Sequence, residues 1–91
     1  MTFEQLRYII EIQRAGTILA AAEKLNVSPP AISKAISNLE DELQINIFIR
    51  TKTGSYPTQE GERIIQLAQQ ILNCAEEMRQ IPYQREKIAL N

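Results

Sequence analysis

The side chains best suited to contact another molecule lie in the segment from Ser28 to Leu43. Ser33, Lys34 and Ser37 fall on one side of this segment when it is wound as a helix of about 3.6 residues per turn. Hydroxyls donate and accept hydrogen bonds, and a lysine ammonium is a flexible positive charge, so these groups suit phosphate oxygens and base edges. The pattern predicts a helix that enters a groove of double-stranded DNA.

The same segment carries the start signals of a helix and an apolar side that can anchor it. Ser28 is a typical N-cap residue, and Pro29 stands at the first helical position, where a missing N–H leaves no helical hydrogen bond unmade. Apolar residues follow at spacings of four, three and four, so we expect the opposite, polar side to face outward. The apolar positions are Ile32, Ile36, Leu39 and Leu43.

Two shorter helical segments precede this one. A capping-box pattern at Thr2 starts the first, which is expected to stop at Gly16, and Thr17 caps the second. Asn26 tolerates a left-handed backbone and forms the turn before Ser28. Two helices joined by such a turn make a helix-turn-helix.

Residues 45–57 change character and predict a small β-hairpin, the wing of a winged helix-turn-helix. Arg50 and Lys52 flank its turn, and we expect at least one of them to contact a phosphate or the minor groove. For Arg50 the alternative is an ion pair with an acid among residues 40–42.

A long helix capped by Thr58 follows, and Pro82 is expected to end it. Its apolar stripe can pack on the first helix of the same chain, but so small a domain cannot cover more than twenty residues, which favours a dimer. A two-fold dimer predicts an interrupted inverted repeat as its DNA target. Cys74 is expected to be buried filler near this seam. The predicted interface residues are Ile64, Ala68, Ile71, Leu72, Ala75 and Met78.

Composition narrows the remaining possibilities. The 91 residues suffice for one small domain, without a secretory signal or a run long and apolar enough to cross a membrane. The absence of histidine removes most metal sites and the commonest general base, and no glycine-rich phosphate loop is present. One cysteine fits a reducing cytoplasm. We therefore expect a cytoplasmic binding protein with no catalytic site, metal or cofactor.

The formal net charge of −1 weighs against nucleic-acid binding. The positive side chains of Lys34, Arg50 and Lys52 are nevertheless concentrated in the segment assigned to DNA, which predicts a local basic face and weak non-specific binding. A dimeric helical protein-interaction module that has lost DNA binding remains the alternative function.

Short motifs in a fixed order and spacing support the first function. They include Ala15-Gly16-Thr17, Ala21-Ala22-Glu23-Lys24-Leu25, Pro30-Ala31-Ile32-Ser33, Ile47-Phe48-Ile49-Arg50 and Thr58-Gln59-Glu60-Gly61. Through these motifs the chain resembles the N-terminal DNA-binding domain of LysR-type transcriptional regulators from about residue 3 to 80. The resemblance implies a mainly α fold: a winged helix-turn-helix over 1–57 (three helices plus the hairpin), then a dimerisation helix over 58–81. The candidate DNA contacts are Thr17, Ser28, Pro29, Pro30, Ser33, Lys34, Ser37, Arg50 and Lys52.

The resemblance also implies that residues 82–91 lead toward an effector-binding domain, with Lys87–Leu90 similar to its first strand. The resemblance implies that a small-molecule effector acts only through that domain, and it allows a tetramer for a full-length protein. The sequence departs from the family where Pro29 replaces a common Gln, Gln44 a common Gly and Thr53 a commonly basic wing residue. We therefore expect weaker base and wing contacts, and no left-handed cap after the Ser28 helix.

Overall fold

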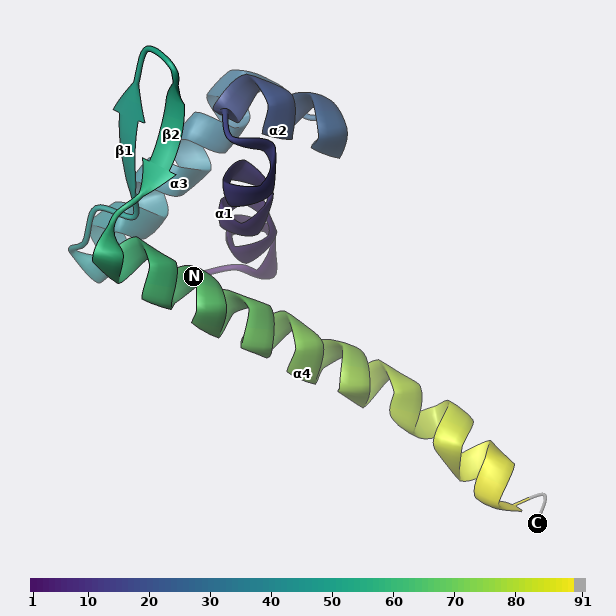
Figure 1. Cartoon of the computed structure of the whole chain (residues 1–91). Helices are drawn as coiled ribbons and strands as arrows, with labels where there is room; N and C mark the ends of the chain where they lie inside the picture. The colour runs from purple at the N-terminus through teal and green to yellow at the C-terminus, as the bar shows by residue number, and fades with distance from the viewer. Residues whose placement is uncertain (90–91) are drawn as a thin grey trace.

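The computed structural model describes residues 1–89 of the chain, with side chains as far as Arg85. Three helices, an antiparallel hairpin and a long final helix follow one another, and Figure 1 shows the final helix leaving the body formed by the others as an arm. The whole measures 57 × 26 × 18 Å because of that arm. The elements are α1 (Phe3–Ala15), α2 (Ile18–Leu25), α3 (Pro29–Leu43), β1 (Phe48–Thr51), β2 (Gly54–Pro57) and α4 (Gln59–Ala89).

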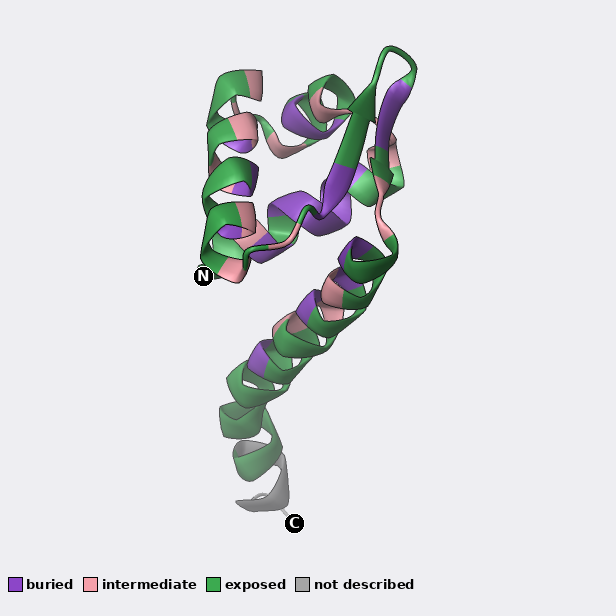
Figure 2. Ribbon diagram, turned by 90° about the vertical axis from the view of Figure 1, so that its left-hand side faces the viewer, coloured by how far each residue is buried: buried purple, intermediate pink, exposed green. Residues whose placement is uncertain are grey.

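The core lies where α1 contacts α2, α3 and the first half of α4. In Figure 2 the buried positions of each helix face this centre, whereas α4 is exposed from Glu76 to Arg85. Burying one such large aliphatic side chain stabilises the fold by about 1.5–3 kcal/mol. The largest fully buried side chains are Ile9, Ile12, Ile32, Ile36, Leu39 and Ile47.

The predicted starts of the first three helices and the predicted stops of α1 and α2 are confirmed. The Thr2 side chain takes part in a complete capping box, and the side chains of Thr17 and Ser28 each accept a hydrogen bond from the backbone of their own first turn. Gly16 and Asn26 end α1 and α2 with left-handed backbones, at φ of 87° and 59°. These local signals set where each helix begins and ends, and the burial of the apolar side of α3 then decides where its polar side points.

The cap expected to be missing after α3 is present, so that prediction was wrong. Gln44 itself adopts the left-handed conformation, at φ 56°, and its N–H bonds the carbonyl of Glu40. Its side-chain Nε2 donates to the carbonyl of Asp41 at 2.7 Å, which offsets part of the strain of a non-glycine residue there.

The hairpin begins three residues later than the apolar run that predicted it. Ile47 is fully buried before the strand, and β1 pairs with β2 in the register Phe48 with Pro57 through Thr51 with Gly54. At the turn end, the N–H of Ser55 donates to the carbonyl of Gly16 at 2.9 Å. The wing is therefore tied to the turn between α1 and α2.

Pro82 does not end the last helix, contrary to the sequence prediction. α4 continues through it to Ala89, so residues 87–89, expected to form a strand, are helical, and Leu90 lies outside the described residues. Proline has no N–H to donate and its ring crowds the carbonyl four residues earlier, so this continuation costs helix stability, and the favourable helix formers Gln84 and Arg85 offset only part of that cost. Within the described chain, no helix combines the length and apolarity needed to span a membrane.

Candidate nucleic-acid interface

The polar side of α3 faces outward, as the apolar stripe predicted. Pro30, Lys34 and Ser37 are exposed and Ser33 is half-buried, while the opposite side packs in the core. We call these four residues, with Arg50 and Lys52 of the hairpin, the recognition surface. It presents hydroxyls and positive charges on one helix and on the wing beside it.

Arg50 connects the two parts of the recognition surface. Its Nη1 donates to Oγ of Ser33 at 2.9 Å, which joins β1 to α3 across 17 positions of sequence. The alternative of an ion pair with residues 40–42 is not seen among the described residues. Lys52 is exposed at the tip of the hairpin and free to reach a phosphate.

Thr17, Ser28 and Pro29 lie at helix starts. The Thr17 hydroxyl accepts from the N–H of Ala20 at 3.0 Å, and the Ser28 hydroxyl from the N–H of Ala31 at 3.3 Å. Each is therefore a structural cap at the positive end of a helix dipole, where phosphate oxygens bind favourably. Pro29 is half-buried and forms the first turn of α3.

Glu40 is a positioning residue that was not predicted from the sequence, because the acids of residues 40–42 were considered only as possible ion-pair partners of Arg50. Its Oε2 accepts hydrogen bonds from the N–H groups of Ile47, at 2.8 Å, and Phe48, at 3.3 Å. The carboxylate thus holds the start of the wing against the end of α3. Its place four residues after the buried Ile36, on the edge of the apolar stripe, was the available signal.

Replacing Glu40 with alanine should lower the free energy of unfolding by about 1.5–3 kcal/mol, because two backbone donors lose a charged acceptor. Urea unfolding at fixed protein concentration measures this change. Asp41→Ala, at an exposed neighbour whose side chain makes no such bond, should stay within about 0.5 kcal/mol. Equal stability of the two variants would show that Glu40 does not anchor the wing.

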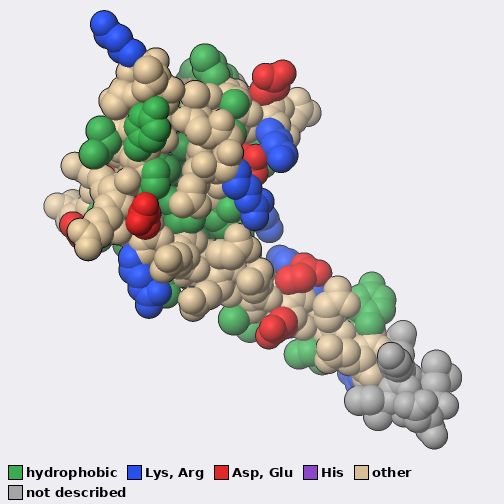
Figure 3. All heavy atoms as spheres, in the orientation of Figure 1, with side chains coloured by type: hydrophobic (Ala, Val, Ile, Leu, Met, Phe, Trp, Pro, Cys, Tyr) green, Lys and Arg blue, Asp and Glu red, His purple; other side chains and the backbone are tan. Residues whose placement is uncertain are grey.

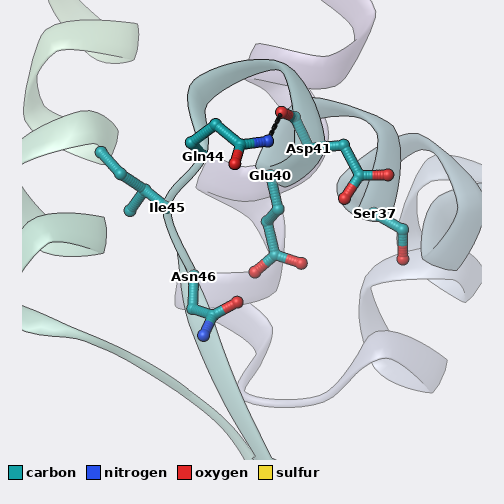
Figure 4. A pocket seen from close by; sticks show the side chains of 6 residues that line it. All are labelled: Ser37, Glu40, Asp41, Gln44, Ile45 and Asn46. Atoms are coloured by element: carbon teal, nitrogen blue, oxygen red, sulfur yellow. Dashed lines mark hydrogen bonds between the residues drawn. The ribbon is translucent and has the colours of Figure 1, made fainter.

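The C-terminal end of α3 is acidic and closes the recognition surface on that side. Figure 4 shows a hollow where Ser37 and Asp41 stand near Glu40 and Asn46. On the face drawn in Figure 3, Asp and Glu side chains lie beside the groups of Lys and Arg side chains. Because the chain carries a net charge of −1, the positive charges of Lys34, Arg50 and Lys52 act only at short range.

Two apolar stripes run along α4, and only one of them is free. The inner stripe packs on the core: Ala68 is 1% exposed, and Ile64 and Leu72 are half-buried. These three predicted interface residues belong to the chain's own fold, and Ala75, 9% exposed, lies at the boundary. The outer, exposed stripe has spacings of four, three, four and three and consists of Leu67, Ile71, Cys74, Met78 and Ile81.

The outer stripe continues into a shallow apolar groove beside α1. Phe3, 44% exposed, forms one wall, and Leu67, Ile71 and Met78 form the other. Cys74 lies exposed in this groove, so its predicted burial is not found in the single chain. The interface predicted from the sequence combined residues of both stripes, because its spacing follows a line on the helix that lies between them.

Known proteins are similar to this chain in sequence and in fold. The family model of the bacterial regulatory helix-turn-helix protein, lysR family, matches residues 3–62. A probable RuBisCO transcriptional regulator of Emiliania huxleyi is 41% identical over 76 residues, which are 84% of this chain and 24% of that protein. The probable regulator LrrA of Synechococcus elongatus is 42% identical over 72 residues, 79% of this chain and 24% of its own length.

Among solved structures, the DNA-binding domain of CbnR in complex with DNA superposes with a TM-score of 0.84 at 32% identity and full coverage of both chains. The chain thus spans about a quarter of the length of the curated relatives described above and the whole of this excised domain.

Proposed function

The chain belongs to the lysR family of bacterial regulatory helix-turn-helix proteins, and from that premise we propose that it binds an interrupted inverted repeat in double-stranded DNA as a dimer and regulates transcription. The observation that carries the proposal is the outward polar side of α3, held next to the wing by the bond between Arg50 and Ser33. A buried polar side would have excluded groove entry.

In the proposed complex α3 lies in the major groove and the wing follows the backbone. Ser33, Lys34 and Ser37 meet base edges or phosphates, and Pro30 contacts a thymine methyl. The helix starts at Thr17 and Ser28 receive phosphates. Arg50 and Lys52 bind backbone phosphate or the minor groove.

We propose a second copy of this chain as the occupant of the groove beside Phe3. The exposed apolar stripe of α4 has heptad-like spacing and runs beyond the body, where no other described segment covers it. Exposed Ile71 and Met78 from the predicted set remain interface residues, with Leu67, Cys74 and Ile81 added. A two-fold dimer sets two α3 helices about one DNA turn, or a multiple, apart.

The curated relatives are about four times longer than the matched part. For a full-length regulator of this kind we propose a cytoplasmic protein whose small-molecule effector acts through a further domain, with tetramers as the larger assembly. The part described here supplies DNA contact and pairing.

Replacing Lys34 with alanine should weaken binding to selected DNA about 5- to 50-fold and reduce the salt dependence of the affinity, by roughly one released counterion per lost phosphate contact. Mobility-shift titrations at several salt concentrations measure both quantities. Arg79→Ala is the control, because Arg79 bonds Glu76 on the arm of α4, away from the recognition surface. Equal losses in both variants would argue against α3 as the contact.

The protein-interaction module remains the second candidate, favoured by the net charge of −1 and the acidic end of α3. Selection of bound DNA from a random pool separates the two functions. An enriched inverted repeat supports the regulator, whereas a stable dimer that binds no DNA at low salt supports the module.

A further inference from the structure

We propose that Arg50 is a positioning residue that makes Ser33 a better hydrogen-bond donor than acceptor, so that the DNA base facing Ser33 is selected for an acceptor atom. This inference rests on the proposed function. Its starting point is the 2.9 Å bond between Nη1 of Arg50 and Oγ of Ser33.

The direction of that bond is set by chemistry. A guanidinium has five N–H donors and no acceptor, so Ser33 must accept. A hydroxyl has two lone pairs and one proton, and the proton stays free because a Ser33 O–H donor bond is not found within the described chain. The neighbouring cation polarises this O–H and makes it a stronger donor, and it draws electron density from the oxygen, so the remaining lone pair is a weaker acceptor.

A fixed donor discriminates between base edges in the major groove. Guanine offers O6 and N7, adenine N7 and thymine O4 as acceptors, whereas cytosine offers only its amino donor. A serine without a cationic partner donates and accepts about equally well. Ser33 bonded to Arg50 accepts less well, because one lone pair is occupied and the other lies beside a positive charge, so it should disfavour cytosine at the position that it faces.

The Arg50 guanidinium can hold Ser33 while it also binds the DNA backbone. Only Nη1 is engaged with Ser33, and the Arg50 side chain is exposed, so its other N–H groups remain open to a phosphate. Arg50 can thus contact a phosphate of the DNA backbone and at the same time orient the hydroxyl of Ser33 on α3.

Arg50→Lys is the decisive variant. Lysine keeps the charge but has no planar fork that can hold Ser33 and a phosphate together. We expect a small, even fall in affinity for all DNA, because Arg50 is itself a backbone contact, and in addition a loss of about 3- to 10-fold in selectivity against cytosine at one motif position per half-site. Ser33→Ala should relax the same position by a similar factor, and the double variant should add nothing further.

Random-pool selection with sequencing of bound DNA, followed by titration of single-base variants, provides the measurement. Lys52→Ala, at the tip of the same wing, should lower affinity evenly across sequences. The inference is overturned if Arg50→Lys keeps the selectivity, or if it and Ser33→Ala alter different positions. Failure of the unaltered chain to select any DNA would instead overturn the proposed function.

Discussion

Replacing Ile71 with glutamate is expected to turn the proposed dimer into monomers and to lower affinity for the proposed inverted repeat by about 100-fold or more. Ile71 is 39% exposed in the single chain and lies in the middle of the outer stripe of α4. Because a two-fold interface uses the same patch twice, one substitution buries two carboxylates without partners. Analytical ultracentrifugation and mobility shifts on one- and two-half-site DNA measure the two effects.

The matched control is Asn73→Glu. Asn73 is exposed on the same helix but belongs to neither stripe, so it receives the same new charge outside the proposed seam. It should leave both dimerisation and operator affinity within about twofold. An unchanged dimer for Ile71→Glu would refute the outer stripe as the interface, and a monomer that still binds the full repeat normally would refute the coupling of pairing to DNA.

The helix-turn-helix was predictable because its information is local. Thr2, Thr17 and Ser28 each precede a helix whose first free N–H groups they satisfy, and Gly16 and Asn26 suit the left-handed turns that follow. The apolar period of α3 then decided which side faces the core. Neither inference required knowledge of the contacts between helices.

The α4 stripes show where periodicity stops being sufficient. A helix that touches its own body on one side and a partner on the next has two apolar stripes side by side, and spacing alone does not divide them. Ala68 and Leu72 pack on the core, whereas Ile71 points away from it. Which apolar residues of α4 pack on the core and which stay exposed is decided only by where α1 lies against α4.

The contacts that organise the recognition surface are also non-local. Arg50 bonds Ser33 over 17 positions, and Glu40 bonds the backbone at Ile47 and Phe48 over seven and eight. The sequence marked Ser33 and Arg50 as contact residues but left their mutual bond unpredicted. Such pairings depend on how the hairpin returns to α3, which no motif in the chain specifies.

Gly61, where the wing meets α4, is a further residue whose role depends on a contact with a residue distant in the sequence. Its amide donates to Oγ1 of Thr58 at 2.9 Å, so it lies in the first turn of α4. A Cβ at this position would stand 2.0 Å from the carbonyl oxygen of Ile47. That carbonyl accepts from the N–H of Thr58, and Glu40 holds the N–H of Ile47, so the backbone has little room to withdraw.

Gly61→Ala is therefore expected to lower the free energy of unfolding by about 2–4 kcal/mol, although alanine in an open helix would raise it by about 1 kcal/mol. A fall in Tm of roughly 10–20 °C at fixed protein concentration is the expected result. Gly16→Ala is the comparison: its Cβ would meet nothing within 4 Å, and only its φ of 87° carries strain, about 1–2 kcal/mol. The only reason to expect a loss of stability is the clash between the new Cβ and the Ile47 carbonyl oxygen. If Gly61→Ala proved as stable as the unaltered chain, the close contact between Gly61 and Ile47 would therefore not hold α4 against the start of the wing.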